Sequence, residues 1–220
     1  MGGMTALAHT LIYPGRADGL VTISSAARSL PFSIALRSLQ REMVRTDPAW
    51  RDGNYAADAP PAQGMRLARK LGMITYRSAE EWLHRFGRER ATDDSASAAP
   101  GSPFGIDFEI ESYLEAHASK FVGSFDANCY LYLSRAMDLF DATDFGGSLA
   151  SALQAVALQR ALVIGVTTDF LFPPHQQQEL AEALTDRGID TEFKLLESIQ
   201  GHDSFLVDMD RFRPAVSAIF

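Results

Sequence analysis

The chain of 220 residues has little cysteine and no long apolar run. Its one cysteine, Cys129, excludes a disulfide within the chain and is typical of a reducing compartment such as the cytoplasm. For Cys129 itself we expect the ordinary role of a small buried apolar residue. No stretch approaches the roughly 18 apolar residues of a membrane-spanning helix, and the first residues lack the pattern of a secretory signal. We therefore expect a cytoplasmic protein with no membrane partner.

Positive charge is scarce as well, since 20 Lys and Arg stand against 28 Asp and Glu and give a net charge of −8. An acidic chain is poorly suited to nucleic acid, so we expect no nucleic-acid partner. Residues 31–90 are the exception, with 11 Lys and Arg against 7 Asp and Glu. This basic segment either meets an anionic ligand, such as a phosphate-bearing cofactor, or forms a solvated helical face.

Strand and helix signals alternate in the last third of the chain. The run "RALVIGVTTD" is almost continuously apolar and ends in polar residues, as does a strand inside a parallel sheet. A helix with proline in its first turn follows in "PPHQQQELAEALTDRG", and "TEFKLLES" has the pattern of a second strand. The final "LVDMDRFRPAVSAIF" predicts a helix. This order is a parallel crossover unit, so the fold class is α/β.

The first two thirds of the chain fit the same class with a helical insertion. Apolar residues recur at helical spacing from Met4 to Ile12, and a short strand is predicted at Leu20–Ser25. Helical patterns dominate from residue 31 onward, interrupted by a low-complexity stretch at 91–103 that we expect to be a flexible surface loop. We predict an α/β core at 1–30 and 146–220 and a helical lid at 31–145.

Two residues follow the predicted strands where ligands bind in open α/β sheets. Asp169 comes after "ALVIGV" and His202 after "TEFKLLE". An Asp followed one strand later by a His is the order of the second and third members of an α/β-hydrolase triad. The alternatives are that Asp169 caps the helix near Pro173 and that His202 is a loop histidine with a satisfied ring. The other four histidines lie in predicted helices without metal-like pairing, so we expect no metal site.

A triad also requires a serine, which this fold places in G-x-S-x-G. Ser24 and Ser25 follow a strand but lack the flanking glycines. The opening "MGG" instead matches the residues that come after such a nucleophile, where glycines allow close backbone approach. We therefore expect the strand, glycine and serine of the elbow to lie upstream of Met1. The chain would then be part of a longer protein, inactive and poorly soluble by itself.

Several stretches together make a more specific resemblance. They are "MGGMTAL", "RSLQRE", "GMRLARKLGMITYRSAEEW", "FEIESYLEAHASKFVGSFDANCYLYLSRAMDLFD", "TTDFLFPPHQQQELAEAL" and "QGHDSFLVD". The sequence resembles the C-terminal part of the homoserine O-acetyltransferase family, which has the α/β-hydrolase fold. Within it, "LPFSIALRSLQRE" and the "GMRLARKLG" stretch look most like the serine O-succinyltransferase branch.

The resemblance implies roles for individual residues. It assigns Asp169 and His202 to the triad and the backbone N–H of Met1 to the oxyanion hole. It implies that Arg69 binds the carboxylate of the amino-acid substrate, that Tyr76 faces the same substrate, and that Asp203 holds its ammonium group. These residue types suit their ligands, because a guanidinium binds a carboxylate bidentately. A surface role for Arg69 and a helix N-cap role for Asp203 remain the alternatives.

The activity implied is transfer of an acyl group from succinyl-CoA or acetyl-CoA to the hydroxyl of L-serine or L-homoserine, through an acyl-enzyme. The best match is serine O-succinyltransferase, with acyl-CoA as co-substrate, no bound cofactor, and a homodimer as the complete form. A homoserine O-acetyltransferase, an esterase on the same fold, and a catalytically inactive chain that pairs with a partner are the alternatives.

Overall fold

The computed structural model describes residues 1–92 and 104–217. Contacts divide the chain into two units. The sheet unit comprises Met1–Ile34, Tyr76–Ser78 and Arg135–Phe220, and the helical unit comprises Ala35–Thr75 and Ala79–Ser134. Most of the loop predicted at 91–103 lies outside the described residues. The extent of a lid at 31–145 stays a prediction.

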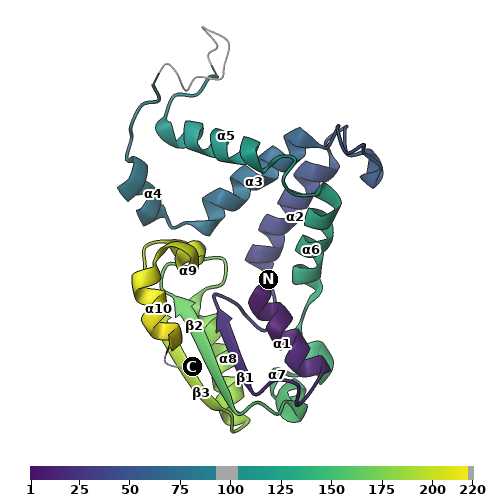
Figure 1. The fold of residues 1–220 in the computed structure, drawn as a ribbon, viewed down its shortest axis with the longest axis vertical. Coiled ribbons are helices and arrows are strands. Elements are labelled where there is room, and N and C mark those ends of the chain that lie inside the picture. Colours follow the sequence, from purple (N-terminus) through teal and green to yellow (C-terminus); the bar gives the residue numbers. More distant parts are fainter. Residues whose placement is uncertain (93–103, 218–220) are drawn as a thin grey trace. The chain divides into compact units, whose positions relative to one another are not determined.

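Within the described residues, three parallel strands form the sheet, in the spatial order β1-β2-β3 (Figure 1). They are β1 (Gly19–Ile23), β2 (Arg160–Val166) and β3 (Asp190–Leu196). The first residues of β1 and β3 both pair with Arg160, so the three strands begin level with one another. Their carboxyl ends therefore meet at one edge of the sheet, the edge where open α/β sheets bind ligands.

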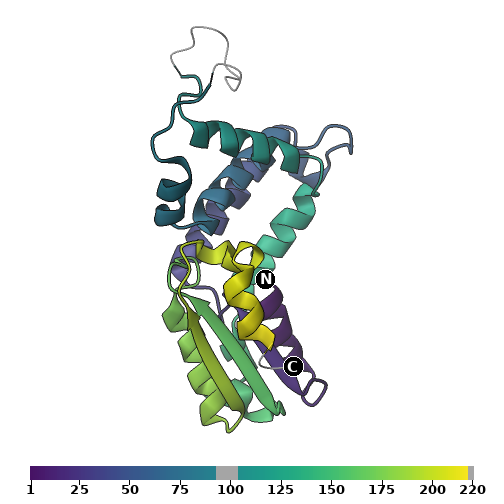
Figure 2. The same ribbon diagram turned by 60° about the vertical axis from the view of Figure 1, so that its left-hand side comes forward.

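Helices cover both faces of the sheet, as the apolar run of β2 predicts (Figure 1, Figure 2). Val163 belongs to the apolar cluster that β2 forms with α1 (Gly2–Ile12) and α8 (Pro174–Asp186). The next residue, Ile164, points to the opposite face and packs against α10 (Met209–Ser217). Because successive side chains of a strand alternate between faces, a strand buried on both sides has no polar alternation. The predicted parallel α/β arrangement is confirmed.

The C-terminal helix differs from its prediction. A short helix, α9 (Ser204–Val207), precedes α10, and Asp208 between them has non-helical backbone angles. The carboxylate of Asp208 accepts a hydrogen bond of 2.7 Å from the Ser198 hydroxyl. This long-range bond favours a break that the helical periodicity of the sequence does not contain.

The opening glycines of α1 have different surroundings. A Cβ at Gly3 would lie 2.6 Å from both Cβ and Oγ of Ser25, in the turn after β1, whereas a Cβ at Gly2 would meet nothing within 4 Å. The close backbone approach predicted from "MGG" is thus present at Gly3.

We expect Gly3→Ala to lower the free energy of unfolding by roughly 1–3 kcal/mol, because the added methyl group displaces the turn at Ser25. Gly2→Ala is the matched control and should be neutral or stabilise by up to about 1 kcal/mol, the difference in helix propensity. Urea unfolding of the complete protein measures both. Equal unfolding free energies for the two variants would contradict the packing at Gly3.

The helical unit is built from the segments that lie between β1 and β2 in the chain. Its helices are α2 (Pro31–Arg45), α3 (Ala62–Tyr76), α4 (Ala79–Phe86), α5 (Glu109–Phe121) and α6 (Ala127–Leu139), of which α2, α3 and α6 have one end in the sheet unit. Val44, Met65, Ala68 and Ala127 form its buried apolar cluster. The shorter elements of the chain are η1 (Arg51–Gly53), η3 (Ala142–Phe145), α7 (Leu149–Ala152), η4 (Leu153–Ala155) and η5 (Gly201–Asp203).

Cys129 is exposed, so the prediction of a buried apolar role is wrong. It lies in the first turn of α6, where its backbone N–H donates a 2.7 Å hydrogen bond to Asp126. A hydrogen bond to the Asp126 carboxylate raises the pKa of the Cys129 thiol, which disfavours a reactive thiolate.

No helix among the described residues has the length and apolar character needed to cross a membrane.

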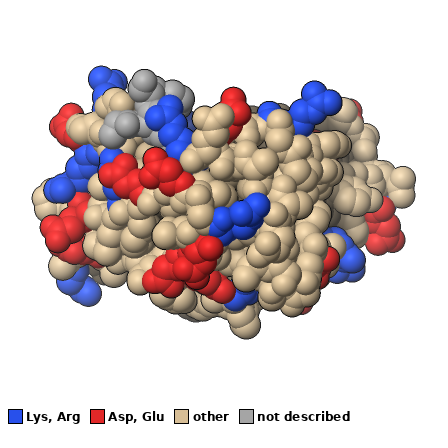
Figure 3. All heavy atoms as spheres, turned by 90° about the horizontal axis from the view of Figure 1, so that it is seen from below, with Lys and Arg blue, Asp and Glu red and all other residues tan. Residues whose placement is uncertain are grey.

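Charges of both signs are interspersed on the face shown in Figure 3. Within the basic segment, Arg66 and Lys70 on α3 both contact the carboxylate of Glu115 on α5, the latter at 2.5 Å. Burial raises the pKa of Glu115, but the hydrogen bonds from Lys70 and Ser119 and the charges of Lys70 and Arg66 outweigh it, so that the pKa is lowered. Part of the excess positive charge is therefore compensated within the helical unit.

Candidate active site

Asp169 lies just beyond the carboxyl end of β2 and is almost completely buried. Its Oδ1 accepts hydrogen bonds of 3.0 Å from the backbone N–H groups of Leu171 and Phe172. A buried carboxylate requires such partners, and here they belong to the turn before α8 rather than to the helix itself. The N-cap of α8 is Pro173. Asp169 therefore does not cap that helix, which was one alternative for it.

His202 follows β3 and reaches the second oxygen of this carboxylate. Its Nδ1 lies 2.8 Å from Oδ2 of Asp169, and its side chain is 17% exposed. An ionised carboxylate only accepts hydrogen bonds, so with Asp169 ionised this bond requires the proton on Nδ1. The neutral ring then has a lone pair on Nε2, the nitrogen that acts as general base in a Ser–His–Asp triad.

Aromatic side chains surround the imidazole. The ring centroids of Tyr76, Phe172 and Phe205 lie 6.1, 5.5 and 6.1 Å from that of His202. Tyr76 is the last residue of α3, yet it belongs to the sheet unit. The structure thus brings together three residues that the sequence singled out, namely Asp169, His202 and Tyr76.

The loop that carries His202 is tied to the end of β2 through Thr168, next to Asp169. The Thr168 hydroxyl donates a 2.6 Å hydrogen bond to the Ser198 carbonyl and accepts one of 3.1 Å from the Gly201 N–H. The buried Ser204 hydroxyl donates to the Gly201 carbonyl at 2.5 Å. These bonds fix the loop relative to the carboxylate. Sequence reasoning missed Thr168, whose only signal is its position beside Asp169.

Ser24 is in the position of a possible nucleophile because it directly follows β1 at the same edge of the sheet. Its backbone φ of 47° is a strained value for a residue other than glycine, as in many nucleophile turns. The Ser24 hydroxyl, however, exposes less than 1 Å² to solvent. A substrate cannot reach a hydroxyl in that position, so we do not assign the nucleophile to Ser24.

Met1 and Asp203 occupy helix starts. Met1 is the N-cap residue of α1 and is half exposed. Asp203 directly follows His202 and occupies the N-cap position of α9, but its side chain makes no capping hydrogen bond. Asp203 therefore occupies the position expected for a helix cap but does not make the hydrogen bond of one. The roles of both residues in substrate chemistry remain predictions.

Arg69 lies on α3 in the helical unit. Its guanidinium carbon is 4.8 Å from the centroid of the Phe121 ring, and its Nε is buried without a hydrogen-bond partner among the described residues. Arg66 and Lys70, by contrast, share Glu115. A stacked guanidinium with an unused Nε–H donor is suited to an incoming carboxylate. This environment favours a binding role over that of a solvated surface arginine.

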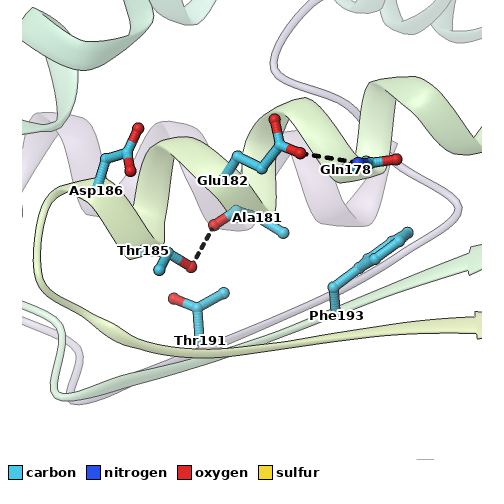
Figure 4. Close-up of a pocket in the computed structure, with 7 residues that line it drawn as sticks. All are labelled: Gln178, Ala181, Glu182, Thr185, Asp186, Thr191 and Phe193. Atoms are coloured by element: carbon cyan, nitrogen blue, oxygen red, sulfur yellow. Dashed lines mark hydrogen bonds between the residues drawn. The ribbon is translucent and has the colours of Figure 1, made fainter.

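A hollow lies between α8 and β3 (Figure 4). Gln178, Glu182, Thr185, Asp186, Thr191 and Phe193 line it together with Ala181. Gln178 and Glu182 hydrogen-bond to each other at 2.8 Å, and Thr185 donates to the Ala181 carbonyl. Thr191 is near the start of β3, whereas the Asp169–His202 pair lies beyond the opposite ends of the strands. This hollow is therefore separate from the candidate site.

Comparison with known proteins agrees with the fold. Residues 1–208 match a family described as alpha/beta hydrolase fold. The serine O-succinyltransferase of Litchfieldella anticariensis is 56% identical over 220 residues, which are 99% of this chain and 59% of that protein. The chain thus spans less than two thirds of the length of this relative.

Two solved structures are similar in fold. The homoserine O-acetyltransferase from Bacillus anthracis superimposes with a TM-score of 0.85 at 22% identity, over 99% of this chain and 57% of that one. Esterase E22 superimposes with a TM-score of 0.82 at 23% identity, over 98% of this chain and 57% of that one. At such identities the likeness concerns the fold alone.

Proposed function

The chain belongs to the alpha/beta-hydrolase fold family, and we propose that it carries the acid and base residues of an acyl-CoA-dependent serine O-succinyltransferase. The observation that carries the proposal is the 2.8 Å contact between His202 Nδ1 and Asp169 Oδ2 at the carboxyl edge of the sheet. The 56% identity to a serine O-succinyltransferase supports the choice of donor and acceptor.

In this proposal the nucleophile is a serine that precedes Met1 in the complete protein. His202 Nε2 takes the hydroxyl proton while the serine oxygen attacks the thioester carbonyl of succinyl-CoA. The C–S bond then breaks, His202 returns the proton to the CoA sulfur, and the succinyl group remains on the serine. The backbone N–H of Met1 is one of two donors to the oxyanion that forms at each attack.

The second half-reaction repeats the chemistry with the amino acid as nucleophile. His202 removes the proton from the hydroxyl of L-serine, that oxygen attacks the acyl-enzyme, and the proton returns to the enzyme's serine as the ester bond breaks. Asp169 keeps the proton of the imidazole on Nδ1 and stabilises the imidazolium that forms at each step. A cycle of this kind gives ping-pong kinetics.

Three residues are proposed to bind the acceptor. The Arg69 guanidinium binds its carboxylate, Tyr76 contacts it beside His202, and Asp203 pairs with its ammonium group. Arg69 and Tyr76 are seven residues apart on α3, which places them on the same face of that helix. Other basic residues of 31–90, apart from Arg66 and Lys70, which pair with Glu115, and Arg77, which binds Gln200, help to receive the phosphates of CoA and the carboxylate of the succinyl group.

Arg69→Ala should impair use of the amino acid and leave formation of the acyl-enzyme intact. Loss of a charge-assisted bond to a substrate carboxylate costs roughly 2–4 kcal/mol, or about 30- to 1000-fold in kcat/KM for serine. Stopped-flow measurement of the burst of CoA, with and without serine, separates the two half-reactions.

Arg213→Ala, at an exposed position of α10, is the control and should behave like the wild type. Arg69→Lys should recover only part of the loss, because an ammonium group lacks the planar fork. An unchanged KM and kcat/KM for serine in Arg69→Ala would assign Arg69 to the surface.

The function itself is tested by steady-state assays of the complete protein with succinyl-CoA and acetyl-CoA as donors and L-serine and L-homoserine as acceptors. We expect the highest kcat/KM for succinyl-CoA with L-serine. Preference for acetyl-CoA with homoserine would make the protein a homoserine O-acetyltransferase, and CoA release that ignores the acceptor would make it a hydrolase. Absence of CoA release with every combination would favour a binding chain.

A further inference from the structure

The last residue of α3 and the two residues that link α3 to α4 contact the loop that carries His202. Tyr76, Arg77 and Ser78 belong to the sheet unit, although the helices on either side of them lie in the helical unit. The Ser78 hydroxyl, buried at 6% exposure, donates to the carbonyl of Ile199. The Arg77 guanidinium donates a 2.8 Å hydrogen bond to the side-chain oxygen of Gln200.

Gly201 brings the two backbones into direct contact. A Cβ at this position would lie 2.8 Å from the carbonyl carbon of Arg77 and from the nitrogen of Ser78, and 2.9 Å from the carbonyl oxygen of Tyr76. Its φ of 71° is also a conformation that favours glycine. The histidine loop therefore depends on glycine at 201 in order to pass this segment.

The loop is held from two sides as a result. Thr168, at the end of β2, binds the backbone of Ser198 and Gly201. Ser78, in the link between α3 and α4, binds the backbone of Ile199 between them. Thr168 is covalently next to Asp169, so the hydrogen bonds of Thr168 tie the loop to the carboxylate. The hydrogen bond of Ser78 ties the loop to the segment that follows α3.

We propose that Ser78 is a positioning residue that holds the loop at Ile199, and with it His202, in the orientation that catalysis requires. The proposal rests on the catalytic role proposed for His202. Ser78 contacts the loop at Ile199, so it acts through His202.

The test is Ser78→Ala in the complete protein. We expect kcat for acyl transfer to fall roughly 10- to 100-fold, because a small misplacement of a catalytic group has effects of that size. The KM values for serine and succinyl-CoA should stay within about twofold, which is the signature of an interaction that acts on the chemical step. Ser78→Thr retains the hydroxyl and should restore kcat. Ser124→Ala, an exposed serine that also donates to a backbone carbonyl, should have no effect.

Amide hydrogen exchange of residues 198–203 provides a readout that does not depend on the reaction. Ser78→Ala should accelerate exchange in this loop while β2 keeps its protection, and Ser78→Thr should reverse the change. Three results would each overturn the proposal. They are loop exchange identical to the wild type, accelerated exchange throughout the sheet unit, and a loss of activity that results from a raised KM for serine. The wild type could transfer no acyl group while loop exchange still changes in Ser78→Ala. That result would refute the proposed function but support the effect of Ser78 on the loop.

Discussion

His202→Ala is expected to reduce acyl transfer by the complete protein at least about 10⁴-fold, with the fold intact. Without the imidazole no group takes the proton from the attacking hydroxyl or returns it to the CoA sulfur. The side chain is only partly buried, so its loss should change the unfolding transition little. Turnover of CoA with succinyl-CoA and serine measures the effect.

His175→Ala is the matched control, since His175 is an exposed residue of α8 and lies outside the proposed site. It should retain full activity. If His202→Ala kept even about a tenth of wild-type turnover, histidine would have no place in the mechanism, because members of a triad act as a unit.

Asp169→Asn is expected to cost on the order of 10⁴ in kcat while preserving the local structure. The amide oxygen of asparagine can still accept the two backbone N–H groups of Leu171 and Phe172. Its NH₂ group then faces His202 and donates to Nδ1, which moves the ring proton to Nε2. A ring protonated there cannot act as the base.

The measurement is single-turnover acylation by succinyl-CoA across a range of pH. Asp186→Asn, at an exposed position near the end of α8, is the control and should react like the wild type. Acylation by Asp169→Asn within about tenfold of the wild-type rate would show that the 2.8 Å contact with His202 does not set the tautomer.

The fold was largely predictable from local pattern. The apolar run of β2 has no polar alternation because both of its faces are buried, and that is visible in the sequence. The proline in the first turn of α8 likewise marks its start. The break at Asp208 was not predictable, because it depends on a hydrogen bond from Ser198 in another segment.

The candidate site was also predictable in part from local sequence pattern. Asp169 and His202 could be found because each follows a strand, and strand ends converge in a parallel sheet. The contact of Ser78 with the loop at Ile199 joins residues more than a hundred positions apart, and no pattern of sequence spacing predicts it. The exposure of Cys129 also could not be foreseen, since it depends on which face of α6 is covered.

The central claim, a covalent succinyl-enzyme that serine discharges, is tested most directly by intact mass spectrometry of the complete protein mixed with succinyl-CoA. We expect a species heavier by one succinyl group to accumulate without an acceptor and to disappear rapidly when L-serine is added, with O-succinylserine as the product. His202→Ala should not form it. Failure of the wild type to acquire the adduct, or loss of the adduct at the same rate with and without L-serine, would contradict the account.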